Sequence, residues 1–155
     1  NLRPGGAAQA ALYARAQHAF TDAMQITALL AAAVLLLAAS AAFAAPAEND
    51  KQQGIEAFCN AAANMAYDSM LSGLKGEKRP AIQKKLEAKY LKPFADDKNL
   101  SGIMGEQIKY ALKKTEVILK EAKQAGLKVK PADYEELATE AGRAEMEVCM
   151  KNMAE

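Results

Sequence analysis

Tryptophan is absent from the chain, and histidine occurs only once. That residue, His18, lies before the uncharged run at 26–45, so the sequence after this run offers no imidazole for a Ser or Cys triad, a zinc site or an axial haem ligand. No CxxC or CxxCH motif and no glycine-rich phosphate loop occurs. These absences argue against most hydrolase mechanisms, haem-carrying helical bundles in their usual form and phosphate-loop nucleotide binding.

Long apolar runs are also missing, with a single exception at residues 26–45, which contain no charge. The small-x-small pattern Ala42-Phe43-Ala44 is typical of a signal peptidase site, and a polar segment follows at once. We interpret residues 24–44 as a signal peptide cleaved after Ala44, and residues 45–155 as an exported domain. Residues 1–23 are interpreted as an upstream extension or a misassigned start. An uncleaved anchor is the alternative, because about 20 apolar residues can span a bilayer.

Cysteine is scarce, with Cys59 and Cys149 as the two residues of this type. In an oxidising compartment an even number of cysteines favours a disulfide over a metal or redox pair. We therefore predict a Cys59–Cys149 disulfide. It would close a loop of 91 residues, counted from one cysteine to the other inclusive, for which the chain-entropy relation gives about 4 to 5 kcal/mol of stabilisation.

Ala, Lys and Glu dominate the remaining sequence, which favours helix over strand. Apolar spacing and Gly or Pro punctuation predict four helices. They begin near Asn49 or Asp50, at Pro80, at residues 99–101 and after Pro131, and the first three end before Gly73 and Gly76, at Pro93 and at Gly126.

The third helix has the clearest apolar stripe, formed by Met104, Ile108, Ala111, Leu112, Thr115, Ile118, Leu119 and Ala122. Cys59 lies early in the first helix and Cys149 late in the last. In an antiparallel arrangement those two ends of the chain lie at the same end of the molecule. The fold class predicted is therefore all-α: a small bundle of about four helices, antiparallel and closed by one disulfide.

Charge is unevenly distributed along residues 45–155, although 16 Lys and 2 Arg balance 18 Asp and Glu. Residues 75–130 carry 15 basic and 7 acidic residues, while the flanking segments are acidic. A net charge of zero gives no overall field toward nucleic acid. We interpret the basic second helix as a solvated face; the alternative is an anion-facing surface for lipid headgroups or an acidic partner.

One short run resembles the opening of an EF-hand calcium loop. Asp97, Asn99 and Ser101 supply oxygen atoms at positions 1, 3 and 5, and a glycine follows at position 6. Ile108 occupies position 12, where the calcium loop requires a bidentate Glu. We therefore favour a helix cap, with Asn99 or Ser101 capping the third helix after a turn at Asp96 and Asp97.

Soft thioether ligands gather on the last helix, where Met146, Met150 and Met153 are spaced i, i+4, i+7. Thioethers select Cu(I). Methionine at helical spacing is also typical of an adaptable hydrophobic surface, which is the interpretation we favour. Four glutamates on the same helix, at positions 135, 136, 140 and 147, are attributed to the helix dipole and solvation rather than to a carboxylate pair.

No constellation of residues therefore predicts catalysis or a cofactor. We expect a periplasmic or secreted, non-enzymatic protein that acts in protein interaction or as a chaperone-like stress accessory. The alternative is a small-ligand or metal-binding module for Cu(I) or Ca²⁺. The expected partner is another envelope protein, with no nucleic acid and with membrane contact only through the signal segment. The oligomeric state stays open.

Overall fold

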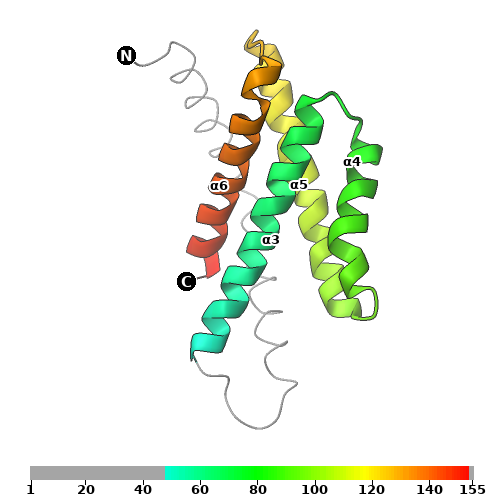
Figure 1. The fold of residues 1–155 in the computed structure, drawn as a ribbon, viewed down its shortest axis with the longest axis vertical. Coiled ribbons are helices and arrows are strands. Elements are labelled where there is room, and N and C mark those ends of the chain that lie inside the picture. Colours follow the sequence, from blue (N-terminus) through cyan, green and yellow to red (C-terminus); the bar gives the residue numbers. More distant parts are fainter. Residues whose placement is uncertain (1–47, 154–155) are drawn as a thin grey trace.

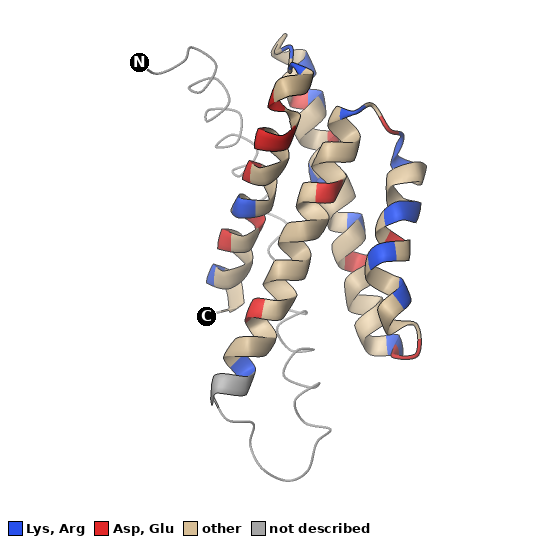
Figure 2. Cartoon of the chain, in the orientation of Figure 1, with Lys and Arg blue, Asp and Glu red and all other residues tan. Residues whose placement is uncertain are grey.

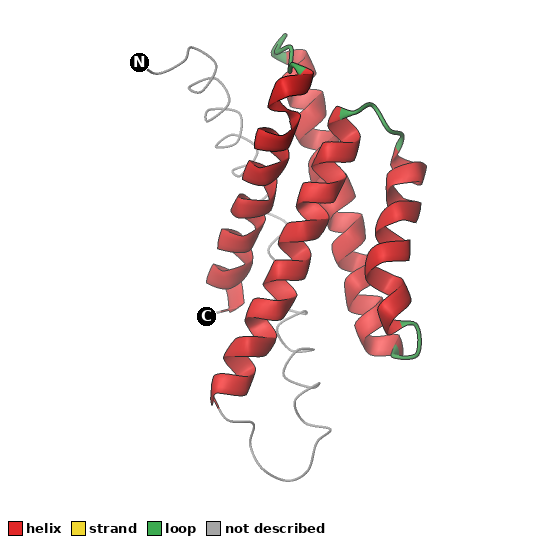
Figure 3. Cartoon of the chain, viewed as in Figure 1, coloured by secondary structure: helices red, strands yellow, loops and turns green. Residues whose placement is uncertain are grey.

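Four α-helices run alternately up and down in the computed structural model, which describes residues 48–153 (Figure 1). They are α3 (Glu48–Leu74), α4 (Arg79–Leu86), α5 (Lys98–Gln124) and α6 (Tyr134–Met153). Within these residues the remaining chain forms turns and short helical pieces, without a strand (Figure 3). The predicted all-α antiparallel bundle is confirmed. The proposed signal peptide (24–44), the extension at 1–23 with His18 and the cleavage point after Ala44 lie outside the described residues.

Most helix ends follow the punctuation of the sequence. The break predicted at Gly73 is wrong, because α3 continues through it to Leu74. Gly76 and Gly126 adopt φ values of +81° and +69°, a left-handed conformation that favours glycine after a helix C-terminus. At the start of α5, Asp97 accepts hydrogen bonds at its Oδ1 from the backbone N–H groups of Asn99 and Leu100, both at 3.0 Å. The cap predicted at Asn99 or Ser101 is therefore wrong. Asp97 is the residue with extended backbone, so the helix begins at once after it.

The second predicted helix is less regular than the sequence suggested. The α-helix ends at Leu86 and continues as a π-helical turn, η3 (Glu87–Leu91), and a 3-10 turn, η4 (Lys92–Phe94). Pro93 lies in the last of these turns and has no N–H to continue an α-helix. Within η3, Lys89 Nζ and Tyr90 Oη both donate to Asp68 Oδ2 of α3 at 2.7 Å. The irregular turn thus remains joined to the bundle by side-chain bonds.

Two clusters form the apolar core. The first joins α3, α4 and α5 through the buried side chains of Met65, Ile82, Leu86, Met104, Ile108, Ala111 and Leu112. The second joins α3, α5 and α6 through Met70, Ile118, Ala138 and Ala141. The stripe predicted on α5 is confirmed as core-facing, with Leu119 and Ala122 only half-buried.

Small residues dominate the contact between α3 and α6, which lie side by side in Figure 1. Ala62 and Ala66 are buried on α3, and Ala138, Ala141, Gly142 and Ala144 are buried on α6. A Cβ atom on Gly142 would lie 3.0 Å from the backbone oxygen of Ala63. The two helices therefore approach closely and bury few large apolar side chains between them.

Gly142→Ala should lower the free energy of unfolding by about 1–3 kcal/mol, because the added methyl group meets the backbone of α3. The matched control is Gly105→Ala on α5, where a Cβ would meet nothing within 4 Å. That control should gain about 0.5–1 kcal/mol from improved helix propensity. Urea denaturation followed by circular dichroism measures both changes. Equal stabilisation of the two variants would show that α3 and α6 are not in close contact.

Candidate functional site

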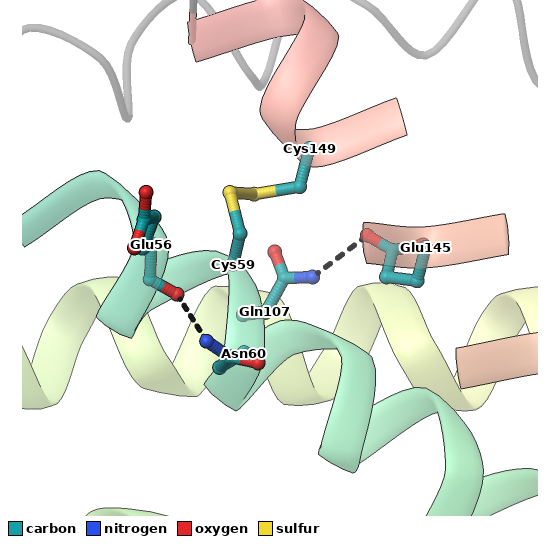
Figure 4. The surroundings of a disulfide bond; sticks show 6 residues. All are labelled: Glu56, Cys59, Asn60, Gln107, Glu145 and Cys149. Atoms are coloured by element: carbon teal, nitrogen blue, oxygen red, sulfur yellow. Dashed lines mark hydrogen bonds between the residues drawn. A yellow bond between two sulfur atoms is a disulfide. The ribbon is translucent and has the colours of Figure 1, made fainter. Parts of the chain in front are cut away.

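Cys59 of α3 and Cys149 of α6 form a disulfide bond with an S–S distance of 2.04 Å (Figure 4). The predicted pairing is confirmed. Cys59 is fully buried and Cys149 is 4% exposed. Both thiols are consumed in this bond, so neither supplies a thiolate for a metal or for nucleophilic attack.

A buried ion pair lies between α5 and α6, where Lys114 Nζ donates to Glu145 Oε2 at 3.0 Å. The two side chains are only 11% and 7% exposed. Gln107 Nε2 donates to the other carboxylate oxygen at 3.2 Å (Figure 4). Every buried polar side-chain atom among the described residues has a hydrogen-bond partner, so the three residues form a satisfied polar cluster.

Sequence reasoning missed this polar cluster, although its spacing carried a signal. Glu145 lies four residues from both Ala141 and Cys149, which are buried on α6. Gln107 and Lys114 are seven residues apart, beside the apolar stripe of α5. Helical periodicity therefore places all three on inward faces. Charged residues are seldom buried without a partner, and the pairing of Lys114 with Glu145 is not visible in the sequence alone.

Two tyrosines with perturbed acidity accompany the buried polar groups. Tyr110 lies beside the cluster, with Lys114 Nζ 5.8 Å from its ring centroid. Burial raises the pKa of Tyr110 to about 12, and the charge of Glu145 adds to that shift. Burial, followed by the hydrogen bond to Asp68, raises the pKa of Tyr90 well above its ordinary value. Both phenols therefore remain protonated at neutral pH, and the Tyr90 hydroxyl donates a hydrogen bond to Asp68.

The calcium-like run is used as a helix start. Asp97, the residue at the first ligand position, directs its Oδ1 atom to two backbone N–H groups. Asn99 and Ser101 lie in the first turn of α5. Within residues 48–153, no group of three or more His, Cys, Asp or Glu side chains is placed to hold a metal ion. Asp97 thus has a structural role that requires no ion.

The six methionines within residues 48–153 divide into two groups. Met65, Met70 and Met104 are core residues, with exposures of 7% or less. Met146, Met150 and Met153 are half-buried on α6. We call these three residues the methionine flank. These three residues are therefore partly exposed, unlike the methionines of the core.

Three of the surface glutamates of α6 bond to neighbouring tyrosine or arginine side chains. Tyr67 Oη donates to Glu135 Oε2. Arg143 bonds Glu140 at 2.8 Å and reaches Glu147 at 3.4 Å. The hydrogen bond to Glu135 raises the pKa of Tyr67, and the bond to Glu140 raises that of Arg143. These contacts stabilise helix surfaces and describe no catalytic cleft.

No helix within residues 48–153 combines the length and apolarity needed to cross a membrane. Comparisons of the chain with protein-family models, with curated proteins and with solved structures find no match. A proposal of function therefore rests on this chain's own residues.

Proposed function

We propose that this protein is an exported, non-enzymatic helical protein that binds another protein of the cell envelope, or an unfolding client, through the methionine flank of α6. The observation that carries the proposal is the partial exposure of Met146, Met150 and Met153 on a helix held in place by a disulfide. Methionine adapts its shape to irregular apolar partners. A rigid helix that presents three such side chains suits a surface that must fit more than one partner.

Two features support export. The apolar segment at 26–45 with its small-x-small end is typical of a signal peptide. The protein contains a disulfide, and disulfides persist mainly in proteins of oxidising compartments. Together they favour a periplasmic or secreted protein as the setting for the interaction.

An aggregation-protection assay tests the interaction. The protein should delay the aggregation of a reduced or acid-unfolded client, and Met146→Gln/Met150→Gln should lose most of this effect because it makes the flank polar. Met146→Leu/Met150→Leu should keep the effect because it preserves apolar area. Circular dichroism checks that both variants remain folded. Full protection by the folded Gln variant would refute the methionine flank as the binding surface.

Cu(I) binding is a second candidate, favoured by the i, i+4, i+7 spacing of the three thioethers on one helix. The same leucine variant separates the two functions. Leucine keeps apolar area but has no sulfur, so it should abolish a copper site while leaving client binding intact. Titration with Cu(I) in the presence of a competing chelator measures this difference.

A further inference from the structure

Lysine is the most frequent exposed residue on α4 and the turns that extend it. Lys84, Lys85, Lys89 and Lys92 are exposed on residues 79–94, together with Arg79, Pro80, Ala81, Ala88 and Pro93. The arginine is paired with Glu116 at 2.6 Å. The one acidic residue of this segment, Glu87, is half-buried and accepts a hydrogen bond from Gln83 at 2.7 Å. Blue positions accordingly follow α4 along one edge of the bundle in Figure 2. We call these four lysines the lysine face.

Neighbouring carboxylates neutralise only part of the lysine face. Lys85 pairs with Glu77 at 2.6 Å, and Lys89 pairs with Asp68 at 2.7 Å. Lys84 and Lys92 have no ionic partner among residues 48–153. Because both of these side chains are exposed, their charge is available to an external anion.

The charge of the whole bundle is bipolar. The part that contains α4 and α5, residues 75–130, has a net charge of +8. Residues 48–74 carry one basic and four acidic residues, and residues 131–153 carry two basic and six acidic residues. These two segments supply α3 and α6, and α6 lies at the edge of the bundle opposite α4 (Figures 1 and 2). A negatively charged plane would therefore orient the molecule with α4 toward it and α6 away.

We propose that the lysine face docks onto the surface of an anionic phospholipid bilayer. Lysine is depleted at protein–protein interfaces, where aromatic residues and arginine are enriched. A specific phosphate site would favour arginine, whose guanidinium binds bidentately. A row of exposed lysines with small residues between them suits a diffuse layer of anionic headgroups, to which each lysine adds about fivefold in binding. This docking does not depend on the methionine flank and leaves α6 facing away from the membrane.

Vesicle sedimentation tests the proposal, using the protein recovered from the envelope of the expressing bacterium. Binding to vesicles of phosphatidylglycerol and phosphatidylcholine is compared with binding to phosphatidylcholine alone. An apolar segment of the protein would bind to both kinds of vesicle. The difference in binding between them therefore measures the contribution of charge. The test variant is Lys84→Glu/Lys92→Glu. Its matched control is Lys51→Glu/Lys151→Glu, which changes the net charge equally at two exposed lysines of α3 and α6.

The expected result is anionic-vesicle binding that falls with salt, since the Debye length shrinks from about 10 Å at 0.1 M to about 3 Å at 1 M. The test variant should lose about tenfold or more, and the control should retain binding. Equal binding to the two kinds of vesicle at low salt would overturn the proposal. So would equal losses in the two variants, which would indicate net charge alone. Binding to heparin without binding to anionic vesicles would instead identify a soluble acidic partner.

Discussion

Lys114→Met is expected to lower the free energy of unfolding by about 3–5 kcal/mol, because it leaves the Glu145 carboxylate buried without its counter-charge. Glu145 would keep only the hydrogen bond from Gln107 at 3.2 Å. A carboxylate that is 7% exposed has little access to water. Chemical denaturation followed by circular dichroism measures the loss.

The control replaces both members of the ion pair with apolar residues of similar size. The free energy of unfolding of Lys114→Met/Glu145→Leu should lie within about 1 kcal/mol of the wild-type value or above it, because no charge is left buried. Such recovery would show that the single variant suffers from an orphaned charge rather than from lost packing. If Lys114→Met lowered the free energy of unfolding by less than about 1 kcal/mol, the ion pair would be solvated. Water would then reach the polar cluster between α5 and α6.

Removing the disulfide should cost about 4–5 kcal/mol, a large share of the total stability of a domain of this size. The Cys59–Cys149 bond joins residues 90 positions apart and holds α6 to α3. Small residues dominate their shared surface, so little large apolar area is available to replace the covalent bond. Cys59→Ala/Cys149→Ala removes the bond without burying a hydroxyl group. We expect a lower denaturation midpoint with the helical circular dichroism signal largely kept.

Reduction of the wild-type protein by a dithiol provides the companion experiment. Thiol titration in denaturant counts the cysteines released, and the reduced protein should match the alanine variant in its denaturation midpoint. An unchanged midpoint in both samples would mean that the bond does not form in the isolated protein or does not constrain its unfolded state.

The helices could be predicted because their signals are local. Gly76 and Gly126 mark two helix ends, Pro80 and Pro131 mark two starts, and the α5 stripe repeats over five turns. The disulfide could be predicted because only two cysteines follow the apolar segment. Each inference required no knowledge of which helices are neighbours in space.

Features that depend on neighbouring helices were harder to predict. The π-helical turn η3 brings Lys89 and Tyr90 to Asp68, and no local sequence pattern predicts these two hydrogen bonds. An isolated charge is rarely buried, and only the pairing of Lys114 with Glu145 across two helices makes their burial tolerable. The alanines of α6 are compatible with either face, so the close approach of Gly142 to α3 could not be anticipated.

Native mass spectrometry of the full-length chain, expressed in a bacterium with an intact export pathway, tests the account most directly. The expected species begins at Ala45 and is lighter by about two hydrogens than the dithiol form, as one disulfide requires. That result would establish an exported, disulfide-closed bundle. A species that retains residues 1–44 and carries two free thiols would contradict it and would indicate an anchored, reduced protein.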